Sequence, residues 1–403
     1  MRVALIGNMN NCFFSLMRYL RDLDVDTHLF MYQNEYQHFM PENDTYQIDK
    51  YQDYIHYISV ESSGKGLILA NIETIKKELE EYDFFIGFGL APALFRKLNY
   101  QLDIFIPYSD HIELTINEKF QFKNIIKYPI RMYTINKQIE GIKYNTTKII
   151  ASGIMNMTKD SISKLGVEDK LIKQYLMMIY NQEKITVKPN PKYLAPMLNR
   201  DIVIFSHTRH YWKDLIEEYE KKEGVKGSDK LIIGYNEFIK ANKNINSILI
   251  LFEYGKDVDA SKELITQLGI DKYVQWFPMM PRKDILNLID YADIVVDSVL
   301  GEFWGGVGFE GLSRGKIIMQ NVLKSDDEYY QIIGHKPPFI MRSNRGKDVE
   351  KNFTKFIKNK TFYREKSIEN RDWFNKYAGM GLAKEYKKII EQLYQNKCTL
   401  EIK

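Results

Sequence analysis

Two glutamates flank a glycine-rich stretch in the last third of the chain. Glu302 and Glu310 are separated by seven residues, among them Gly305, Gly306 and Gly308. A carboxylate accepts paired hydrogen bonds from a vicinal diol such as a ribose, and glycine lets a ligand approach the backbone closely. The spacing therefore fits a nucleotide sugar, with Glu310 on the ribose and Glu302 either holding sugar hydroxyls or facing a developing positive charge. In the structural alternative, the first acid is a solvated loop residue, the second complements a helix dipole, and the glycines only form turns.

The elements around these acids are predicted to place them at the end of a sheet. The run at 293–299 predicts a buried strand, 309–315 opens or forms a helix, and 316–321 predicts the next strand. Ligands of open parallel sheets collect at the carboxyl ends of the strands, where helix N-termini offer free N–H groups. The backbone at Gly305 and Gly306 is therefore expected to face a phosphate.

Apolar runs rich in β-branched residues alternate with amphipathic stretches along the whole chain, which is typical of parallel sheets covered by helices. The expected strands form two series, at 2–7, 27–32, 83–88, 102–108 and 147–153, and at 201–206, 247–255, 273–278, 293–299 and 316–321. Helices are expected between them, among them 13–23, 72–82, 259–269 and 282–292, with helical material from 153 to about 180. The sequence predicts an α/β fold with two Rossmann-like domains.

A proline-rich stretch separates the two series. Three prolines stand between residues 189 and 196, and proline neither continues a helix nor donates to a ladder. A chain of 403 residues is also long for a single core. We therefore expect an N-terminal domain at 1–190, an extended linker at 191–200, a C-terminal domain at 201–375 that carries the two acids, and a last segment at 376–403 with a helix able to pack back on the N-terminal domain.

The composition excludes several classes of protein. The chain has 57 Lys+Arg against 53 Asp+Glu, a net charge of +4 that demands no anionic partner, and no nucleic-acid recognition motif is present. Cys12 and Cys398 are the only cysteines, so neither a disulfide framework nor a zinc-like cluster is expected. No apolar run approaches the roughly 20 residues of a membrane-spanning helix, and the first residues do not resemble a signal peptide. We expect a cytoplasmic protein.

One family resemblance covers the acids. Glu302-Phe303-Trp304-Gly305, Glu310 and the following Gly315-Lys316-Ile317-Ile318 resemble the E-x7-E motif of retaining GT-B glycosyltransferases of the large family-four type. The resemblance is specific over residues 271–321 and diffuse elsewhere. It implies the GT-B fold, in which two Rossmann-like domains face each other across a cleft.

The resemblance also implies roles for individual residues. Glu310 would bind the ribose of the donor and Glu302 the transferred sugar. The backbone of Gly305, Gly306 and Val307 would bind the sugar and diphosphate. Gly311 stands where the family usually has an alanine, and we expect a looser start of the helix there.

Side-chain cations are expected to stabilise the diphosphate leaving group, because enzymes of this architecture typically use them in place of a bound metal. No metal and no cofactor are therefore expected. Arg209 follows the first strand of the second series, and Lys226 precedes a glycine, which resembles the Arg and Lys-Gly of the family. The gap between them is wider than usual, so Lys213 and Lys230 stay open as substitutes for Lys226. Each lysine is otherwise a plain surface charge.

The first domain is expected to supply the acceptor side. Gly7, Asn10 and Asn11 follow the first strand, where the family has a glycine-rich loop, and they would reach toward phosphate or sugar. His111 follows another predicted strand, near where related enzymes carry an active-site histidine. It would bind the donor sugar or help the acceptor lose its proton. The alternative is a structural histidine.

A basic run interleaved with aromatic and aliphatic residues spans 118–148. An anionic membrane surface attracts such a face, which would suit a lipid-linked acceptor at the inner leaflet. The alternative is the solvated side of a helix.

These inferences combine into one functional prediction. The protein is expected to transfer a sugar from a nucleotide diphosphate sugar to an acceptor hydroxyl of a glycan, a lipopolysaccharide or a lipid-linked saccharide. The transfer is expected to retain the anomeric configuration and to need no metal. A nucleotide-sugar 2-epimerase of similar fold and a catalytically silent sugar-binding or scaffold subunit stay open as alternatives.

Overall fold

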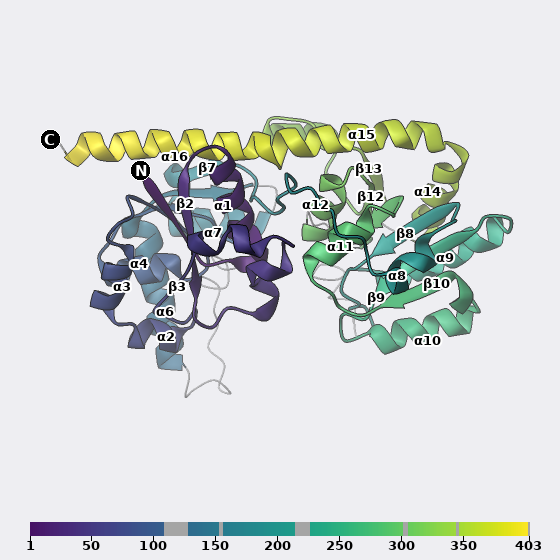
Figure 1. Ribbon diagram of the computed structural model, residues 1–403, viewed down its shortest axis with the longest axis horizontal. Helices are drawn as coiled ribbons and strands as arrows, with labels where there is room; N and C mark the ends of the chain where they lie inside the picture. The colour runs from purple at the N-terminus through teal and green to yellow at the C-terminus, as the bar shows by residue number, and fades with distance from the viewer. Residues whose placement is uncertain (109–127, 153–155, 214–225, 301–304, 344–345, 402–403) are drawn as a thin grey trace. The chain divides into compact units, whose positions relative to one another are not determined.

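The computed structural model describes residues 1–108, 128–152, 156–213, 226–300, 305–343 and 346–401 (Figure 1). The chain forms two compact units. Unit 1 consists of Met1–Tyr180 and Tyr377–Lys403, and unit 2 consists of Asn181–Lys376. Of the predicted site residues, Glu302 and His111 lie outside the described residues.

Unit 1 contains a parallel sheet with the strand order β3-β2-β1-β4-β5-β6-β7. The strands are β1 (Arg2–Ile6), β2 (Asp26–Tyr32), β3 (Ile55–Ile58), β4 (Phe84–Gly87), β5 (Leu102–Phe105), β6 (Thr146–Ala151) and β7 (Leu171–Lys173). The helices of this unit are α1 (Cys12–Asp22), α2 (Gly64–Leu69), α3 (Ile72–Leu79), α4 (Ala91–Leu98), α6 (Tyr128–Glu140), α7 (Asn156–Leu165) and α16 (Met380–Glu401). The strand order reverses between β1 and β4, which makes this the topological switch point of unit 1.

Unit 2 repeats this arrangement with the order β10-β9-β8-β11-β12-β13, again parallel. Its strands are β8 (Ile202–Ser206), β9 (Ser247–Phe252), β10 (Val274–Phe277), β11 (Ile294–Val296), β12 (Ile317–Gln320) and β13 (Ile340–Arg342). Its helices are α8 (Pro191–Leu194), α9 (Ser228–Ala241), α10 (Val258–Leu268), α11 (Arg282–Ile289), α12 (Gly306–Ser313), α13 (Asp326–Ile333), α14 (Gly346–Lys358) and α15 (Lys360–Tyr377). The switch point of unit 2 lies between β8 and β11.

Local chemistry explains where several helices begin and end. The side chains of Ser63 and Asn71 accept hydrogen bonds from backbone N–H groups at the starts of α2 and α3. Gly269 ends α10 in the left-handed conformation, with φ of 68°, as the sequence predicts. Ser325 and Glu328 form a reciprocal capping box at the start of α13.

The two parallel sheets confirm the predicted α/β fold with two Rossmann-like domains. Three strands were not predicted, β3, β7 and β13, because each has three or four residues and carries exposed positions. The prediction of helical material to about 180 was wrong, since α7 ends at Leu165 and β7 follows. The segment predicted as an extended linker contains α8, because Pro191 fits the first turn of a helix and Asn190 caps it.

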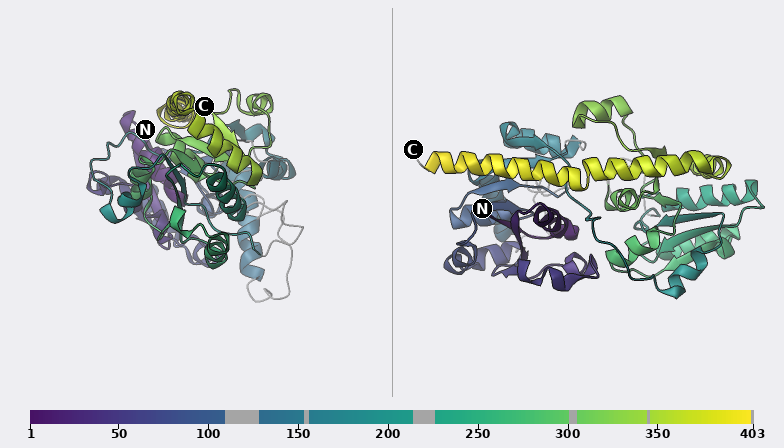
Figure 2. Two further views of the ribbon diagram at one scale, coloured as in Figure 1. Left: turned by 90° about the vertical axis from the view of Figure 1, so that its right-hand side faces the viewer. Right: turned by 45° about the horizontal axis from the view of Figure 1, so that its top comes forward.

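The helix predicted near the end of the chain is α16, which packs on unit 1. In Figure 1 and in the right-hand view of Figure 2, α16 (yellow) lies over α1 (purple), and the two helices are in contact. Tyr386 Oη donates to the Tyr175 carbonyl at 2.9 Å, and Lys387 Nζ donates to the Leu23 carbonyl at 2.8 Å. These bonds tie the end of the chain to the unit in which it begins. The boundary between the units differs from the predicted one, because the first part of unit 1 ends at Tyr180 and not at residue 190.

Candidate functional site

The candidate site of unit 2 is built at its topological switch point. His207 directly follows β8 and Asp297 directly follows β11, and these two strands are neighbours in the sheet. Helix α12, which carries Glu310, begins at Gly306 after the loop that leaves β11. Open parallel sheets bind their ligands at this edge, because strand ends and helix N-termini converge there.

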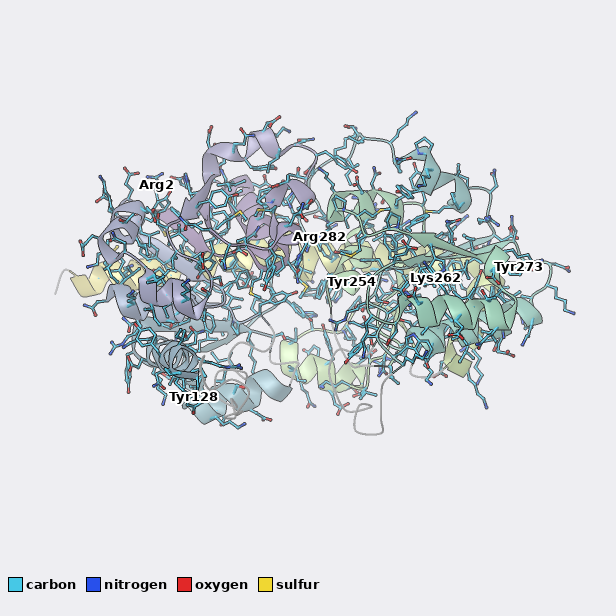
Figure 3. The ribbon with its side chains drawn as sticks, turned by 90° about the horizontal axis from the view of Figure 1, so that it is seen from below. Arg2, Tyr128, Tyr254, Lys262, Tyr273 and Arg282 are labelled. Atoms are coloured by element: carbon cyan, nitrogen blue, oxygen red, sulfur yellow. The ribbon has the colours of Figure 1, made fainter. Side chains whose placement is uncertain are left out.

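Glu310 is held between two side chains from other elements. Its side chain is 8% exposed, Oε2 lies 2.5 Å from His207 Nε2, and Oε1 lies 3.2 Å from Arg282 Nε. Burial opposes ionisation, but His207 and Arg282 outweigh it and hold the pKa of Glu310 below its ordinary value. The carboxylate is therefore ionised and accepts from His207 Nε2–H. Each oxygen keeps capacity for a further donor. Arg282 is labelled in Figure 3.

His207 was not predicted as a site residue. Its ring packs edge-on against Phe205 and Phe252, with ring centroids 5.7 and 5.9 Å away. Its Nδ1 is buried and has no hydrogen-bond partner. A buried polar atom without a hydrogen-bond partner lowers the free energy of unfolding by about 1–3 kcal/mol. Such local losses of stability are typical of functional sites.

Arg282 was not predicted as a site residue. It is the first residue of α11, directly after Pro281. A cation at a helix N-terminus opposes the helix dipole, so its position there was the signal that could have identified it.

Lys226 lies at the same edge of the sheet. Its Nζ is 3.4 Å from Oδ1 of Asp297, whose side chain is completely buried. The Val299 amide donates to the Lys226 carbonyl at 2.9 Å. Gly227 has φ of +70°, and a Cβ there would lie 2.9 Å from Val299 and Leu300 side-chain atoms. Backbone and side chain thus both fix Lys226.

The two alternative lysines have other surroundings. Lys213 is exposed, and its backbone amide donates to Oδ2 of Asp257 at 2.9 Å. Lys230 pairs with Asp229 at 3.1 Å on α9. Lys226 is the one of the three that contacts a strand-end carboxylate of the switch point.

Arg209 is exposed on the loop after β8, with Cζ 5.6 Å from the centroid of the Tyr211 ring. The next residue anchors this loop, because His210 Nδ1 is 2.8 Å from Ser261 Oγ and the ring is buried. Burial lowers the pKa of His210 to about 4. His210 is therefore a neutral structural residue that presents Arg209 at the strand end.

The glycines of α12 differ in their surroundings. An added Cβ at Gly306 would meet nothing within 4 Å, and Val307 beside it is half-buried. A Cβ at Gly308 would lie 3.2 Å from Gln320 Oε1. A Cβ at Gly311 would lie 2.4 Å from Ile318 Cδ1 and 3.0 Å from Val295 Cβ. The expectation of a looser helix start at Gly311 was wrong, because this glycine lets α12 pack closely on β11 and β12.

The helix is preceded by Gly305 in an extended conformation, with φ of −98°. The sequence expects the backbone of Gly305, Gly306 and Val307 to meet the donor, and these residues do form the loop end and first turn of α12.

The predicted residues of unit 1 lie together after β1. Gly7 has φ of +90°, and the Tyr32 ring packs where its Cβ would be, at 3.1 Å. Asn10 and Asn11 are both left-handed, with φ of 49° and 57°. Asn10 Nδ2 donates to Tyr108 Oη, and Asn10 is half-buried.

Asn11 has a structural role in this loop. Its Oδ1 accepts from Asn8 Nδ2 at 2.8 Å, and its Nδ2 faces the carbonyls of His38 and Met40 at 3.4 and 3.3 Å. Asn11 is 1% exposed. Its amide therefore holds the turn between β1 and α1 and is not presented to a ligand.

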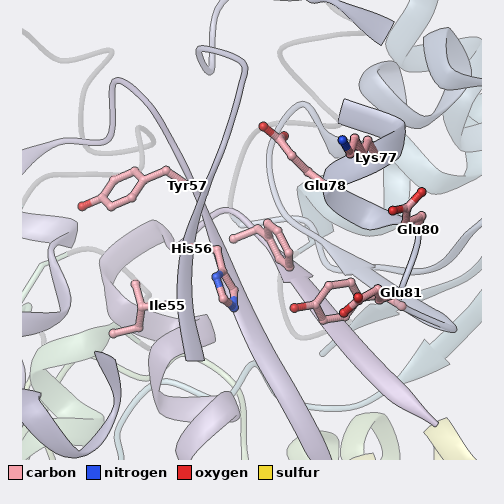
Figure 4. Close-up of a pocket in the computed structure, with 9 residues that line it drawn as sticks. Ile55, His56, Tyr57, Lys77, Glu78, Glu80 and Glu81 are labelled. Carbon is pink, nitrogen blue, oxygen red and sulfur yellow. The ribbon is translucent and has the colours of Figure 1, made fainter. Parts of the chain in front are cut away.

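A pocket of about 420 Å³ lies elsewhere in unit 1 (Figure 4). His56 and Tyr57 of β3 line it together with Lys77 and Glu78 of α3. It follows the edge strand β3, whereas the switch point lies between β1 and β4. This pocket is therefore separate from the predicted residues after β1.

Two general properties concern the described residues only. Within the ranges that the structure describes, no group of three or more His, Cys, Asp or Glu side chains is arranged to hold a metal ion. None of the described helices has the length and apolar character needed to span a membrane.

Comparisons with known proteins identify the fold. No protein-family model and no curated protein matches the chain. Among solved structures, HepE of Anabaena in complex with UDP-glucose matches with a TM-score of 0.61 and 13% identity, covering 99% of this chain and 100% of that chain. WaaG, a glycosyltransferase involved in lipopolysaccharide biosynthesis, matches with a TM-score of 0.56 and 14% identity over 96% and 99% of the two chains.

A third match is a putative UDP-N-acetylglucosamine 2-epimerase of Listeria monocytogenes, with a TM-score of 0.51 and 10% identity over 95% of this chain and 93% of that one. Together with the two parallel sheets, these similarities show that the chain has the GT-B fold.

Proposed function

We propose that this protein is a glycosyltransferase that moves a sugar from a nucleotide diphosphate sugar to an acceptor hydroxyl, with retention of configuration and without a metal. One observation carries the proposal. An ionised, buried Glu310 lies at the switch point of unit 2, fixed by His207 and Arg282. Such a carboxylate, with capacity for two further donors, suits the vicinal hydroxyls of a ribose.

The chemistry follows from charge development. In a retaining transfer, positive charge develops on the anomeric carbon while negative charge develops on the leaving diphosphate. Lys226, oriented by Asp297, and Arg209, presented by the anchored loop, would stabilise the diphosphate. The N-terminus of α12 adds backbone N–H groups at Gly305, Gly306 and Val307.

The remaining roles are predictions of the same proposal. Glu302 would orient the transferred sugar and His111 would act on the acceptor side. In unit 1, Gly7 and Asn10 would contribute to donor binding by reaching toward phosphate or sugar, whereas Asn11, predicted for the same role, shapes their loop.

The matched structures support the donor class and the acceptor class. HepE was solved with UDP and with UDP-glucose, and WaaG is involved in lipopolysaccharide biosynthesis. We therefore propose a nucleotide-sugar donor and a glycan, lipopolysaccharide or lipid-linked acceptor.

The proposed location is the cytoplasm, with peripheral contact at the inner face of the membrane through 118–148. The described part of that run carries Ile130, 39% exposed, and Tyr144, 69% exposed, beside several basic residues. Exposed apolar side chains among cations suit an anionic lipid surface. Sedimentation with anionic and neutral vesicles tests this contact, and equal recovery with both would contradict it.

A thermal-shift screen with UDP, GDP and their sugars tests the donor. A ligand at a hundred times its dissociation constant adds about 2.7 kcal/mol of apparent stability, which raises the melting temperature measurably. Addition of an acceptor saccharide should then give a glycosylated product. A protein that no nucleoside diphosphate stabilises would contradict the proposal.

A nucleotide-sugar 2-epimerase is the second candidate, favoured by the structural match to the Listeria monocytogenes protein. Incubation with the donor sugar alone separates the two activities. A new epimer supports the epimerase, and slow hydrolysis supports the transferase. A silent scaffold subunit is a third candidate, supported if Glu302→Ala leaves the cellular pathway intact while deletion of the chain abolishes it.

A further inference from the structure

We infer that His207 and Arg282 are positioning residues that hold the Glu310 carboxylate in one orientation, and that the preference of the site for a ribonucleoside diphosphate over its 2′-deoxy form depends on both of them. This inference rests on the proposed function, because it names the donor class of that same site.

The positioning argument starts from the two contacts of the carboxylate. His207 Nε2 lies 2.5 Å from Oε2, and Arg282 Nε lies 3.2 Å from Oε1. The three side chains come from different elements, the loop after β8, the start of α11 and the middle of α12. Because the contacts engage opposite oxygens, the carboxylate cannot rotate without losing both.

The orientation of His207 is fixed independently of Glu310. Its ring is edge-on to Phe205 and Phe252, two residues of neighbouring strands, and its side chain is 8% exposed. Nδ1 is buried without a hydrogen-bond partner, so Glu310 is the hydrogen-bond partner that His207 has in the structure. The ring thus keeps one nitrogen without a hydrogen-bond partner while its other nitrogen orients the Glu310 carboxylate, so the role of His207 is more than packing.

Selection between the two classes of nucleotide follows from counting donors. Each oxygen of Glu310 can accept one more hydrogen bond, and a ribose supplies two neighbouring hydroxyls. A 2′-deoxyribose supplies only one hydroxyl, so one oxygen of the buried Glu310 carboxylate would lose its water and gain no hydrogen-bond donor in return. A site built to bind a hydroxyl rejects a ligand that lacks it for this reason.

Isothermal titration calorimetry with UDP, GDP and their 2′-deoxy forms tests the inference. For the nucleotide that binds more tightly, the wild-type protein should bind the 2′-deoxy form roughly tenfold to a hundredfold more weakly. The ratio of the two dissociation constants, 2′-deoxy form over ribonucleotide, should fall to within about threefold of unity in His207→Phe and in Arg282→Met, while affinity for the 2′-deoxy form changes little.

Three further variants separate positioning from general damage. His207→Gln keeps a donor and should restore part of the ratio, and Arg282→Lys keeps the charge and should do likewise. Lys262→Met removes a cation of an exposed ion pair in the same unit and should leave the ratio at its wild-type value. Figure 3 labels Lys262 and Arg282. Circular dichroism confirms that each variant is folded, and Arg282→Met carries the test if His207→Phe is not folded.

The outcomes are distinct. A wild-type ratio near unity, or an unchanged ratio in both His207→Phe and Arg282→Met, would overturn the inference while leaving the proposed function standing. A wild-type protein that binds no nucleoside diphosphate would overturn both.

Discussion

Asp297 holds Lys226 at the carboxyl end of β11: Oδ1 of a completely buried carboxylate lies 3.4 Å from Nζ of the lysine. The other carboxylate oxygen, Oδ2, is buried without a hydrogen-bond partner. A lysine on a flexible four-carbon stem loses its rotational freedom in such a pair, which would preorganise its charge for the proposed diphosphate. The proposed diphosphate cation thus has a partner, Asp297, to which the family resemblance assigns no role.

Asp297→Asn should lower the free energy of unfolding, because it removes the charge that compensates Lys226. We expect a loss of about 1–3 kcal/mol in urea denaturation. Lys226→Met leaves an unpaired buried carboxylate and should cost about 3 kcal/mol or more. The double variant should cost less than the sum of the two. Additive losses would show that the pair is not coupled.

Glu310→Gln should weaken nucleoside diphosphate binding roughly tenfold to a hundredfold, because it replaces a charged acceptor by a neutral amide. Calorimetry measures the change. Glu263→Gln, on the exposed part of α10, is the matched control and should bind as the wild type does. Equal affinity of Glu310→Gln and wild type would place the ribose elsewhere.

Gly311→Ala should destabilise the protein although alanine favours helices. The new Cβ would lie 2.4 Å from Ile318 Cδ1, and overpacking typically costs about 1–3 kcal/mol against a gain of about 1 kcal/mol in helix propensity. Gly306→Ala adds a methyl group in open space on the same helix and should be neutral or slightly stabilising. Thermal unfolding compares the two, and a more stable Gly311→Ala would contradict the close packing of α12.

His210 should make unit 2 sensitive to acid. Burial lowers its pKa to about 4, whereas the unfolded chain binds this proton below its ordinary pKa of 6.5. The unfolded state therefore binds more protons between these values, so stability falls as the pH falls from 6.5 to 4, by up to about 3 kcal/mol. His210→Gln should flatten this part of the curve of unfolding free energy against pH. An unchanged slope would contradict the assignment.

The carboxyl group of Asp103 in unit 1 should have the opposite effect on how stability depends on pH. Burial raises its pKa to about 6, although Lys397 of α16 lies 3.4 Å away. The native state then holds a proton that the unfolded chain releases above pH 3.8, so this group adds stability as the pH falls from 6 to 3.8, by up to about 3 kcal/mol. Asp103→Asn should remove this contribution, and urea titrations at pH 4 and 7 measure it. A variant with the wild-type pH dependence would contradict it.

The sequence by itself determined the elements whose signals are local. The apolar run before Asp297 predicts a strand and Gly269 predicts a helix end, because periodicity and left-handed backbone depend on a few neighbouring residues. The same local signals place Glu310 in a helix after a strand. They fail for β3, β7 and β13, which are too short and too exposed to show a period.

Only the tertiary structure decided which residues meet Glu310. His207 lies 103 positions away in the chain and reaches the carboxylate because β8 and β11 are neighbours in the sheet, although β9 and β10 come between them in sequence. The same strand order brings Lys226 to Asp297, and close packing of α12 gives Gly311 its role. Strand order arises from burying both faces of a sheet under helices, a property of the whole unit that no local stretch of residues carries.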